Sequence, residues 1–473
     1  MWMAAFTCDD CNSMAIKIKN DLTAAKLVPK INRLFELSAA KILNLQKTWN
    51  PSKGTPVFTI KGKYTSRGWT EWTQGFQFGS ALLQFDATGD PQFLELGRKN
   101  TVAVMATHVS HIGVHDHGFN NISTYGNLWR LMREGKIPFN EREKDFYELA
   151  LKVSGAVQAA RWTALGEGRG FIYSFNGPHS LFVDTMRSLR SLAVAHQLGH
   201  VLMGERDQKI SLLDRLLQHA DATARYSIYY GEGRDAFDDR GRTAHESIFN
   251  LNDGSYRCPN SQQGYSPFST WTRGLAWAIL GFAEQLEFFE TLGGSADAKT
   301  ISPATKSFLR ASLATADFYL ENCCADGIPM WDTGAPNLHR LGNYLNKNSD
   351  PFNEWEPVDS SAAAIAAQGL IRLGYYLNGK DEKSARRYLQ AGLTVASTLF
   401  DSPYLSQDLK HQGLLLHSVY HRPKGWDFVA PRQKVPNGES SMWGDYHARE
   451  LGVLLLRRAQ SSNYLTFFAP ASV

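Results

Sequence analysis

Two aspartates stand out because their surroundings suit acid–base chemistry, and the first is Asp184. It follows Leu181, Phe182 and Val183 at the start of the apolar run SLFVDTMRSLRSLAVA. A carboxyl group among apolar side chains loses hydration, so its pKa should rise and it could serve as a general acid near neutral pH. A simpler interpretation is that Asp184 caps a helix and points to water.

The second aspartate, Asp116, lies between His115 and His117 in the run GVHDHGFNN. A metal site is the weaker interpretation of this run, because three adjacent residues cannot easily aim all their groups at one ion. No other His or Cys cluster has ligand spacing either. Two carboxyl groups in different environments are instead the usual acid–base arrangement of sugar hydrolases. Asp116 and Asp184 are therefore the candidate catalytic residues.

A third stretch, SQQGYSPFSTWTRGLAWAILG, could bind a ring-shaped ligand. We expect Ser269 or Thr270 to cap a helix there, with Trp271, Arg273 and Trp277 in its first turns. Flat aromatic faces beside one guanidinium suit a pyranose ring that carries a carboxylate. The plainer alternative is a core helix with one surface arginine.

The elements that must position these residues are mainly helical. Apolar residues recur at helical spacing in about twelve segments. These are residues 20–48, 71–88, 91–109, 121–134, 141–164, 182–198, 206–229, 270–290, 303–323, 359–377, 381–399 and 443–460. Strand-like alternation is scarce, although PVFTI at 56–60 is expected in a hairpin. Gly followed by a charged turn joins several helices, as in TGDPQF, MGERDQK and NGKDEKS, so consecutive helices should be antiparallel neighbours.

The unusual residues fall at the starts of alternate helices. They are Trp72, Asp116 with His117, Asp184, Trp271 with Arg273, Asp359 with Ser360 and Ser361, and Trp443 with Asp445. If the even-numbered helices form an inner ring, all these N-termini meet at one end, where they also favour an anionic ligand. We therefore predict an all-α (α/α)6 barrel with its site at one mouth. Asp359 and Ser360 also fit ordinary helix caps.

Length, charge and cysteine content bound the remaining expectations. The 473 residues fit a mobile N-terminal tail over 1–18 and a single barrel domain over 19–473. Fifty basic against 46 acidic residues leave only +4, so we expect neither a nucleic-acid partner nor a membrane. The N-terminus lacks the features of a secretion signal, and the lone Cys8–Cys11 pair fits reduced thiols. We expect a cytoplasmic location, or a periplasmic one if a signal peptide was removed.

The chain resembles the unsaturated glucuronyl hydrolases of glycoside hydrolase family 88 and, less closely, the unsaturated rhamnogalacturonyl hydrolases of family 105. The resemblance covers most of the chain. It rests on EWTQGFQFG around Trp72, HDHGF around Asp116, FVDTMRSL around Asp184, STWTRGLAW around Trp271, WDTGAP, DSSAAAIAAQGL from Asp359, and ESSMWGDYHARE. Members of this group are (α/α)6 barrels, which agrees with the helix pattern.

The resemblance implies a hydrolase that removes a 4,5-unsaturated uronic acid from the non-reducing end of oligosaccharides left by polysaccharide lyases. In such enzymes water adds across the C4=C5 double bond. Asp184 would protonate C4 and take a proton from the attacking water, while Asp116 would hold ring hydroxyls and tune Asp184. No metal or cofactor is required, and the protein is expected as a monomer or homodimer.

The resemblance also implies a set of substrate-binding residues. They are Trp72, His115, His245, Gln263, Trp271, Arg273, Trp277, Ser360 and Trp443. The segment GYSPFST after Gln263 is bulkier and more apolar than the Gly- and Asp-rich version of well-known members. This departure leaves open which sugar follows the terminal ring and whether a sulfate is tolerated there.

Other functional classes stay open at this point. A non-catalytic sugar-binding protein could use the same barrel, but it would not need two acids in one pocket. A sugar epimerase or a polysaccharide lyase would use His pairs or a Tyr base for catalysis. An ordinary inverting glycosidase would accept a saturated glucuronide as substrate. The product separates these classes, because a lyase creates an unsaturated uronate and the hydrolase removes one.

Overall fold

Two layers of helices surround a common axis in the computed structural model, which describes residues 15–68, 71–293 and 296–469. Cys8, Cys11 and most of the expected tail lie outside the described residues. Residues 15–18, which we had assigned to that tail, are instead packed against the body. Ile16 is only 3% exposed, and its backbone N–H donates a hydrogen bond to the carbonyl of Leu320.

The inner layer consists of helices that are buried around nearly their whole circumference. They are α2 (Gln74–Thr88), α5 (His117–Asn120), α6 (Asn127–Arg133), α8 (Thr185–Ser188), α9 (Arg190–Gln197), α11 (Thr272–Thr291), α13 (Ser360–Leu377) and α15 (Met442–Ala459). Contacts run from α2 through α5 and α6, α8 and α9, α11, α13 and α15 back to α2. The inner helices therefore form a closed ring.

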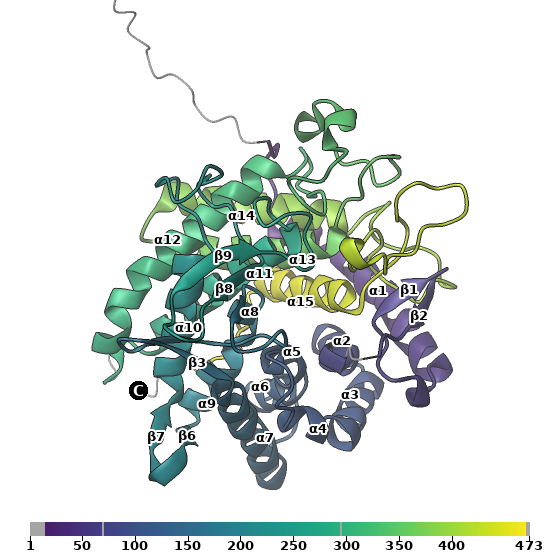
Figure 1. The fold of residues 1–473 in the computed structure, drawn as a ribbon. Helices are drawn as coiled ribbons and strands as arrows, with labels where there is room; N and C mark the ends of the chain where they lie inside the picture. Colours follow the sequence, from purple (N-terminus) through teal and green to yellow (C-terminus); the bar gives the residue numbers. More distant parts are fainter. Residues whose placement is uncertain (1–14, 69–70, 294–295, 470–473) are drawn as a thin grey trace, which may run out of the picture.

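Amphipathic helices form the outer layer, at the periphery in Figure 1. They are α1 (Ala24–Thr48), α3 (Pro91–Val104), α4 (Ala106–Val109), α7 (Glu141–Ala160), α10 (Leu212–Tyr226), α12 (Ala298–Asn322) and α14 (Glu382–Leu399). Inner and outer helices that are neighbours in sequence, such as α11 with α12 or α13 with α14, pack together. The predicted (α/α)6 barrel is therefore confirmed. None of the described helices is both long and apolar enough to cross a bilayer.

Short single turns connect these elements at both ends of the barrel. They are η1 (Pro51–Lys53), η2 (Glu71–Thr73), η4 (Glu205–Asp207), η5 (Leu338–Leu341), η6 (Tyr344–Asn346) and η7 (Arg422–Lys424), together with the π-turn η3 (Ile122–Gly126). Gly89 ends α2 in the left-handed conformation, and Asp90 caps α3 by accepting from the Gln92 N–H, as TGDPQF indicated.

The described residues also form short antiparallel strands between the helices. The expected hairpin at 56–60 is present as β1 (Phe58–Ile60) and β2 (Lys63–Thr65). The others are β3 (Trp162–Gly166) with β4 (Arg169–Ile172), β6 (Val201–Met203) with β7 (Lys209–Ser211), and a sheet of order β5 (Ser180–Phe182), β8 (Glu246–Phe249) and β9 (Tyr256–Asn260). In that sheet Phe182 pairs with Glu246, which places Asp184 and His245 at the same edge.

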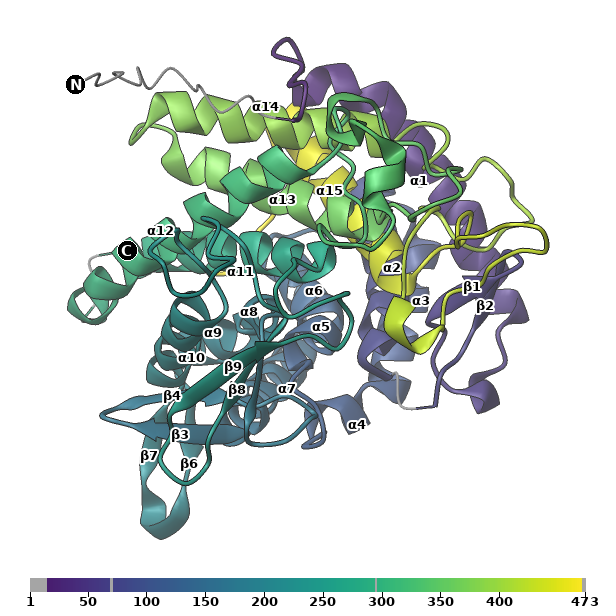
Figure 2. The ribbon, with the colours of Figure 1, turned by 45° about the horizontal axis from the view of Figure 1, so that its top comes forward.

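The start of the helix expected over residues 206–229 was predicted wrongly. We expected a helix from residue 206, but MGERDQK forms the turn of the β6–β7 hairpin, which projects from the body in Figures 1 and 2. Arg206 and Asp207 adopt positive φ angles of 55° and 58°, which a helix does not allow. Helix α10 begins only at Leu212, where the Ser211 hydroxyl caps it.

The segments expected as continuous helices at 121–134 and 182–198 are broken near the barrel mouth. Helix α5 meets α8 there, and the Gly118 N–H donates to the Ser188 hydroxyl at 2.8 Å. A Cβ atom on Gly118 would overlap the backbone of Ser188, so the close approach depends on glycine. Asp116 and Asp184 precede these two helices, and this contact therefore sets how near the two carboxyl groups lie.

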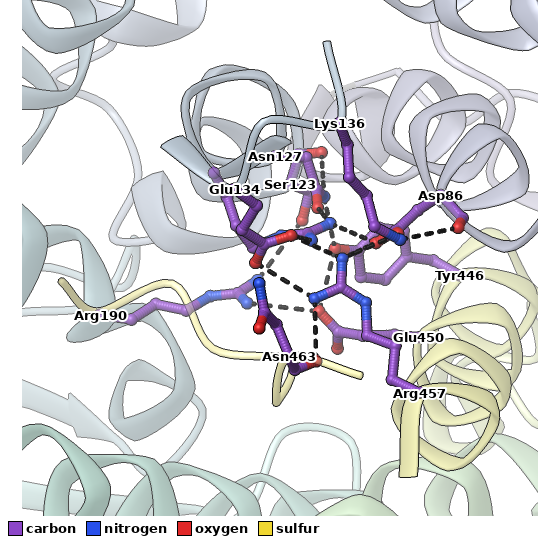
Figure 3. Close-up of polar contacts among 11 residues, drawn as sticks. Asp86, Ser123, Asn127, Glu134, Lys136, Arg190, Tyr446, Glu450, Arg457 and Asn463 are labelled. Carbon is purple, nitrogen blue, oxygen red and sulfur yellow. Dashed lines mark hydrogen bonds and ion pairs between the residues drawn. The ribbon is translucent and has the colours of Figure 1, made fainter. Parts of the chain in front are cut away.

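A buried network of charges closes the opposite end of the barrel (Figure 3). The Asp86 carboxylate accepts hydrogen bonds from Arg130 and Arg457 at 2.8 Å, and Arg457 also bonds Glu134. Burial alone would raise the pKa of Asp86, but Arg130, Arg457 and Lys136 together hold it below its usual value. Asp86 lies 12 residues beyond Gln74, which is about 18 Å along the helix axis.

Replacing Gly118 with alanine should destabilise the protein. The new methyl group would meet the Ser188 backbone and push α5 away from α8. Overpacking of this kind costs about 1–3 kcal/mol, which a urea titration of wild type and Gly118→Ala would measure. Gly68→Ala is the control, because a Cβ there meets nothing within 4 Å. Equal unfolding midpoints for all three proteins would contradict the role of this contact.

Candidate active site

A cavity of about 570 Å³ opens at the mouth where the inner helices begin. Its lining combines aromatic rings with a few polar groups. The lining residues are Trp72, His115, Asp116, Phe119, Phe175, Phe182, Asp184, Gln262, Gln263, Trp271, Arg273, Trp277, Tyr420, His421 and Trp426. Both candidate acids therefore face one cavity.

Asp184 occupies the N-cap position of α8, yet its side chain makes no capping hydrogen bond. The side chain is 12% exposed, and its Oδ1 atom forms no hydrogen bond. The pKa of Asp184 is raised to about 8, mainly by burial and in addition by the negative charge of Asp116, while Arg273 opposes both effects. The carboxyl group is therefore mostly protonated at neutral pH and free to face a ligand.

Asp116 repeats this arrangement before α5, again without a capping bond. Burial raises its pKa to about 7, and Arg161 partly opposes the rise. The nearest ring, His115, has its Nε2 atom 3.6 Å from Asp116 Oδ1. Burial holds the pKa of His115 well below its usual value, so the ring is neutral and supplies no counter-charge.

His245 stands behind Asp184 and does not line the cavity. Its Nδ1 atom accepts hydrogen bonds from the backbone N–H groups of Gln262 and Gln263, at 3.0 and 3.3 Å. Burial lowers its pKa to about 3, so the ring is neutral. Since Nδ1 is an acceptor, the single proton is on Nε2, which lies 3.9 Å from Asp184 Oδ1. A neutral N–H group therefore faces the carboxyl from the protein side.

Arg273 is buried in the wall of the cavity. Its guanidinium donates to Asp359, Gln263 and the carbonyls of Val419 and Tyr420. The guanidinium carbon lies 4.5 Å and 4.8 Å from the centres of the Trp271 and Trp443 rings. Arg273 thus fixes the orientation of Gln263 and the position of the Val419–Tyr420 segment. This positioning role could not be predicted from the sequence.

Besides His245, two more of the expected substrate contacts lie behind the wall. Trp443 stacks on Trp72 at a centroid distance of 5.1 Å and donates to the Ser361 hydroxyl. Ser360 is fully buried, with its hydroxyl 3.3 Å from that of Ser418. Neither residue lines the cavity, because both lie one layer below its surface and contact other protein groups. Trp443 instead packs beneath the ring of Trp72, which lines the cavity.

The helix caps also differ from expectation. Trp271, and neither Ser269 nor Thr270, occupies the N-cap position of α11, and the Thr270 hydroxyl accepts from the backbone of Thr243. Asp359 does cap α13, since its carboxylate accepts from two N–H groups of the first turn. The capping interpretation therefore holds for Asp359 but not for the two acids in the cavity.

The His-Asp-His run splits into divergent side chains. Asp116 lines the cavity, whereas the ring of His117 bonds the Ser154 hydroxyl and the carbonyl of His111. Over the part of the chain that the structure describes, no three His, Cys, Asp or Glu side chains gather as a metal site would require.

No family model matches the chain, but several characterised proteins are similar to it over most of its length. An unsaturated glucuronyl hydrolase (UGL) of Bacillus sp. (strain GL1) is 25% identical over 398 residues, 82% of this chain and 87% of that protein. An unsaturated chondroitin disaccharide hydrolase of Streptococcus pyogenes serotype M1 is 23% identical over 406 residues, 84% of each chain. A solved UGL variant with dGlcA-Glc-Rha-Glc is 23% identical, has a TM-score of 0.67, and covers 91% of this chain and 96% of its own.

The chain is a homologue of the unsaturated glucuronyl hydrolases. The solved UGL structure shares the fold over 91% of this chain. Several cavity residues of this UGL homologue were not predicted from the sequence. They are Phe119, Phe175, Phe182, Gln262, Tyr420, His421 and Trp426. Most come from loops without periodicity, where only a local cluster of aromatic residues could have indicated them.

The raised pKa of Asp184 predicts a pH-dependent change in stability. Between about pH 4 and 8 the carboxyl ionises in the unfolded chain but stays protonated in the folded one, so its contribution to stability falls as pH rises. The Asp184→Asn variant removes this loss. Its melting temperature should exceed that of wild type at pH 8 by more than at pH 4, as measured by calorimetry. Asp214→Asn, at an exposed helix start, is the control. The same difference at both pH values would contradict burial of an unpaired carboxyl.

Proposed function

We propose that this protein is a glycoside hydrolase that removes a 4,5-unsaturated uronic acid from the non-reducing end of oligosaccharides. The observation that carries the proposal is the pair of buried carboxyl groups, Asp116 and Asp184, which share one cavity and cap no helix. Homology to UGL and to unsaturated chondroitin disaccharide hydrolases supports the same reaction class. We assign the catalytic unit to a single domain, which includes the packed residues 15–18 as well as the barrel expected from residue 19 onward.

Asp184 acts as the general acid and base in this proposal. Its carboxyl group, protonated at neutral pH, donates its proton to C4 of the enol ether. Positive charge develops at C5 and the ring oxygen, and a water molecule adds its oxygen to C5. The water's extra proton passes to the Asp184 carboxylate, which restores the starting state. The hemiketal formed at C5 then opens, and the sugar leaves from C1 without direct attack on the glycosidic bond.

Asp116 supplies the negative charge that this step needs. Of the two carboxyl groups it has the lower pKa, about 7 against about 8, so the pair loses its first proton mainly there. Its charge raises the pKa of Asp184 and stabilises the oxocarbenium-like transition state. The Nε2–H group of His245 faces Asp184 Oδ1 and limits the orientations of that carboxyl group.

The remaining cavity residues bind the substrate in this proposal. Trp72 and Trp277 form the aromatic wall beside the sugar ring. The rest of the pocket around the ring is formed by His115, Gln263 and Trp271. The N-termini of the inner helices point into the same space and favour the uronate carboxylate. The dGlcA-Glc-Rha-Glc bound to the solved UGL variant is a ligand of this chemical class.

Ultraviolet absorbance of the conjugated double bond tests the reaction. Wild type should abolish the absorbance of unsaturated disaccharides prepared by lyase digestion, and Asp184→Asn should be slower by about 10²–10⁴-fold, because it lacks the general acid. Asp214→Asn should match wild type, since this residue is exposed on α10. Near-normal turnover by Asp184→Asn would exclude its role. No loss of absorbance with folded wild type on any digest would refute the proposed reaction.

A further inference from the structure

Three aromatic side chains stand exposed beside the cavity, and we call Phe237, Tyr265 and Phe268 the aromatic rim. They are 52%, 52% and 44% exposed, respectively. The rings of Phe237 and Phe268 pack together at a centroid distance of 5.1 Å. Tyr265 and Phe268 belong to the segment GYSPFST. Large apolar side chains that remain exposed next to a binding cavity indicate a ligand surface.

Chain geometry places the aromatic rim at the edge of the cavity. The segment that carries it starts and ends in the cavity lining, at Gln263 and Trp271. Tyr265 is two residues from Gln263 and Phe268 is three residues from Trp271, so their α-carbons lie within about 7 Å and 11 Å of the lining residues. A ligand that extends beyond the cavity on this side therefore meets the rim.

Buried polar groups hold the rim in place. The Asp332 carboxylate accepts from the backbone N–H of Tyr265 at 2.8 Å. The guanidinium of Arg242 donates to the carbonyl of Pro267 at 3.3 Å and to Asp235 at 2.6 Å. The other oxygen of Asp235 accepts from the N–H of Phe237. The two loops are thus joined through one buried arginine, which fixes the exposed rings relative to the cavity.

The segment that carries Tyr265 and Phe268 offers no charge to a ligand. Residues 261–271 contain no acidic or basic side chain. In the loop that carries Phe237, Asp239 is an exposed acid and Arg240 is paired with Asp317. Arg242 is only 2% exposed and is paired with Asp235, so it cannot serve as a counter-ion. A sulfated or carboxylated sugar placed here would lose hydration without gaining an ion pair from this segment. A neutral pyranose ring, which has an apolar face of C–H groups, suits a flat aromatic surface better.

We propose that the aromatic rim binds neutral sugar rings that follow the terminal unsaturated uronate, so that the enzyme prefers unsaturated oligosaccharides longer than a disaccharide. This inference rests on the proposed function, because the terminal uronate must occupy the cavity for the following rings to reach Tyr265 and Phe268. It assigns the segment GYSPFST and Phe237 as specificity determinants for uncharged substrates.

The test compares two substrates that share the unsaturated uronate and the first linkage, a disaccharide and a tetrasaccharide of otherwise neutral sugars. Tyr265→Ala and Phe268→Ala should lower kcat/KM for the tetrasaccharide about tenfold, mainly through KM, and change it less than about twofold for the disaccharide. Phe139→Ala is the matched control, because Phe139 is 70% exposed but follows α6 at the far end of the barrel. It should change neither value.

Several outcomes would overturn the inference. These are equal losses on both substrates, no loss on either, or conversion of a wild-type dimer to a monomer by Phe268→Ala, which would make the rim a subunit contact. If wild type cleaves neither substrate, the proposed reaction fails separately. Calorimetric titration of the tetrasaccharide into wild type and Phe268→Ala then tests binding by the aromatic rim independently of the reaction. Equal affinities would reject the role of the rim in binding.

Discussion

Burial of the inner helices on every side is the constraint on which the rest of the structure depends. A charged side chain that points into the ring cannot reach bulk water, so it needs a partner inside. Deep in the barrel the partners exist, since Arg187 pairs with both Glu284 and Glu450. At the mouth, within the described residues, neither Asp116 nor Asp184 pairs with a lysine or arginine. The same burial that requires ion pairs deep in the barrel therefore raises the pKa values of these two unpaired acids.

The broken ends of the inner helices convert this constraint into a site. Helices α5 and α8 are short, and the contact between Gly118 and Ser188 lets their backbones approach closely. The N-cap residues of these helices, Asp116 and Asp184, then face one cavity. Loops complete the walls: Arg273 holds Gln263 on one side and the Val419–Tyr420 segment on another. The reactive groups come from the helix ring, and the surface that selects the substrate comes from the loops.

Much of the barrel could be predicted from the sequence because its signals are local. Helical spacing of apolar residues and Gly-Asp junctions such as Gly89–Asp90 depend on a few neighbouring residues. Which side chains of the cavity wall face the cavity, and which lie beneath them, could not be predicted in this way. Trp443 and Trp72 both begin inner helices, yet Trp443 lies beneath Trp72 and only the latter faces the cavity.

The loop residues of the cavity could not be predicted from the sequence for a related reason. Tyr420, His421 and Trp426 reach the cavity through irregular backbone that has no period to detect. The Asp residues at helix starts also looked alike in sequence. Whether such a residue caps its helix, as Asp359 does, or makes no capping bond, as with Asp184, depends on the tertiary packing around it.

The most direct test of this account is a carbon-13 NMR titration of the aspartate carboxyl groups, with Asp116→Asn and Asp184→Asn used for assignment. The account predicts two carboxyl groups that titrate far above the usual range, Asp116 at about 7 and Asp184 at about 8, and a lower pKa for Asp184 once Asp116 is neutral. If both groups titrate near 4, as exposed aspartates do, the central claim of a desolvated acid pair is contradicted.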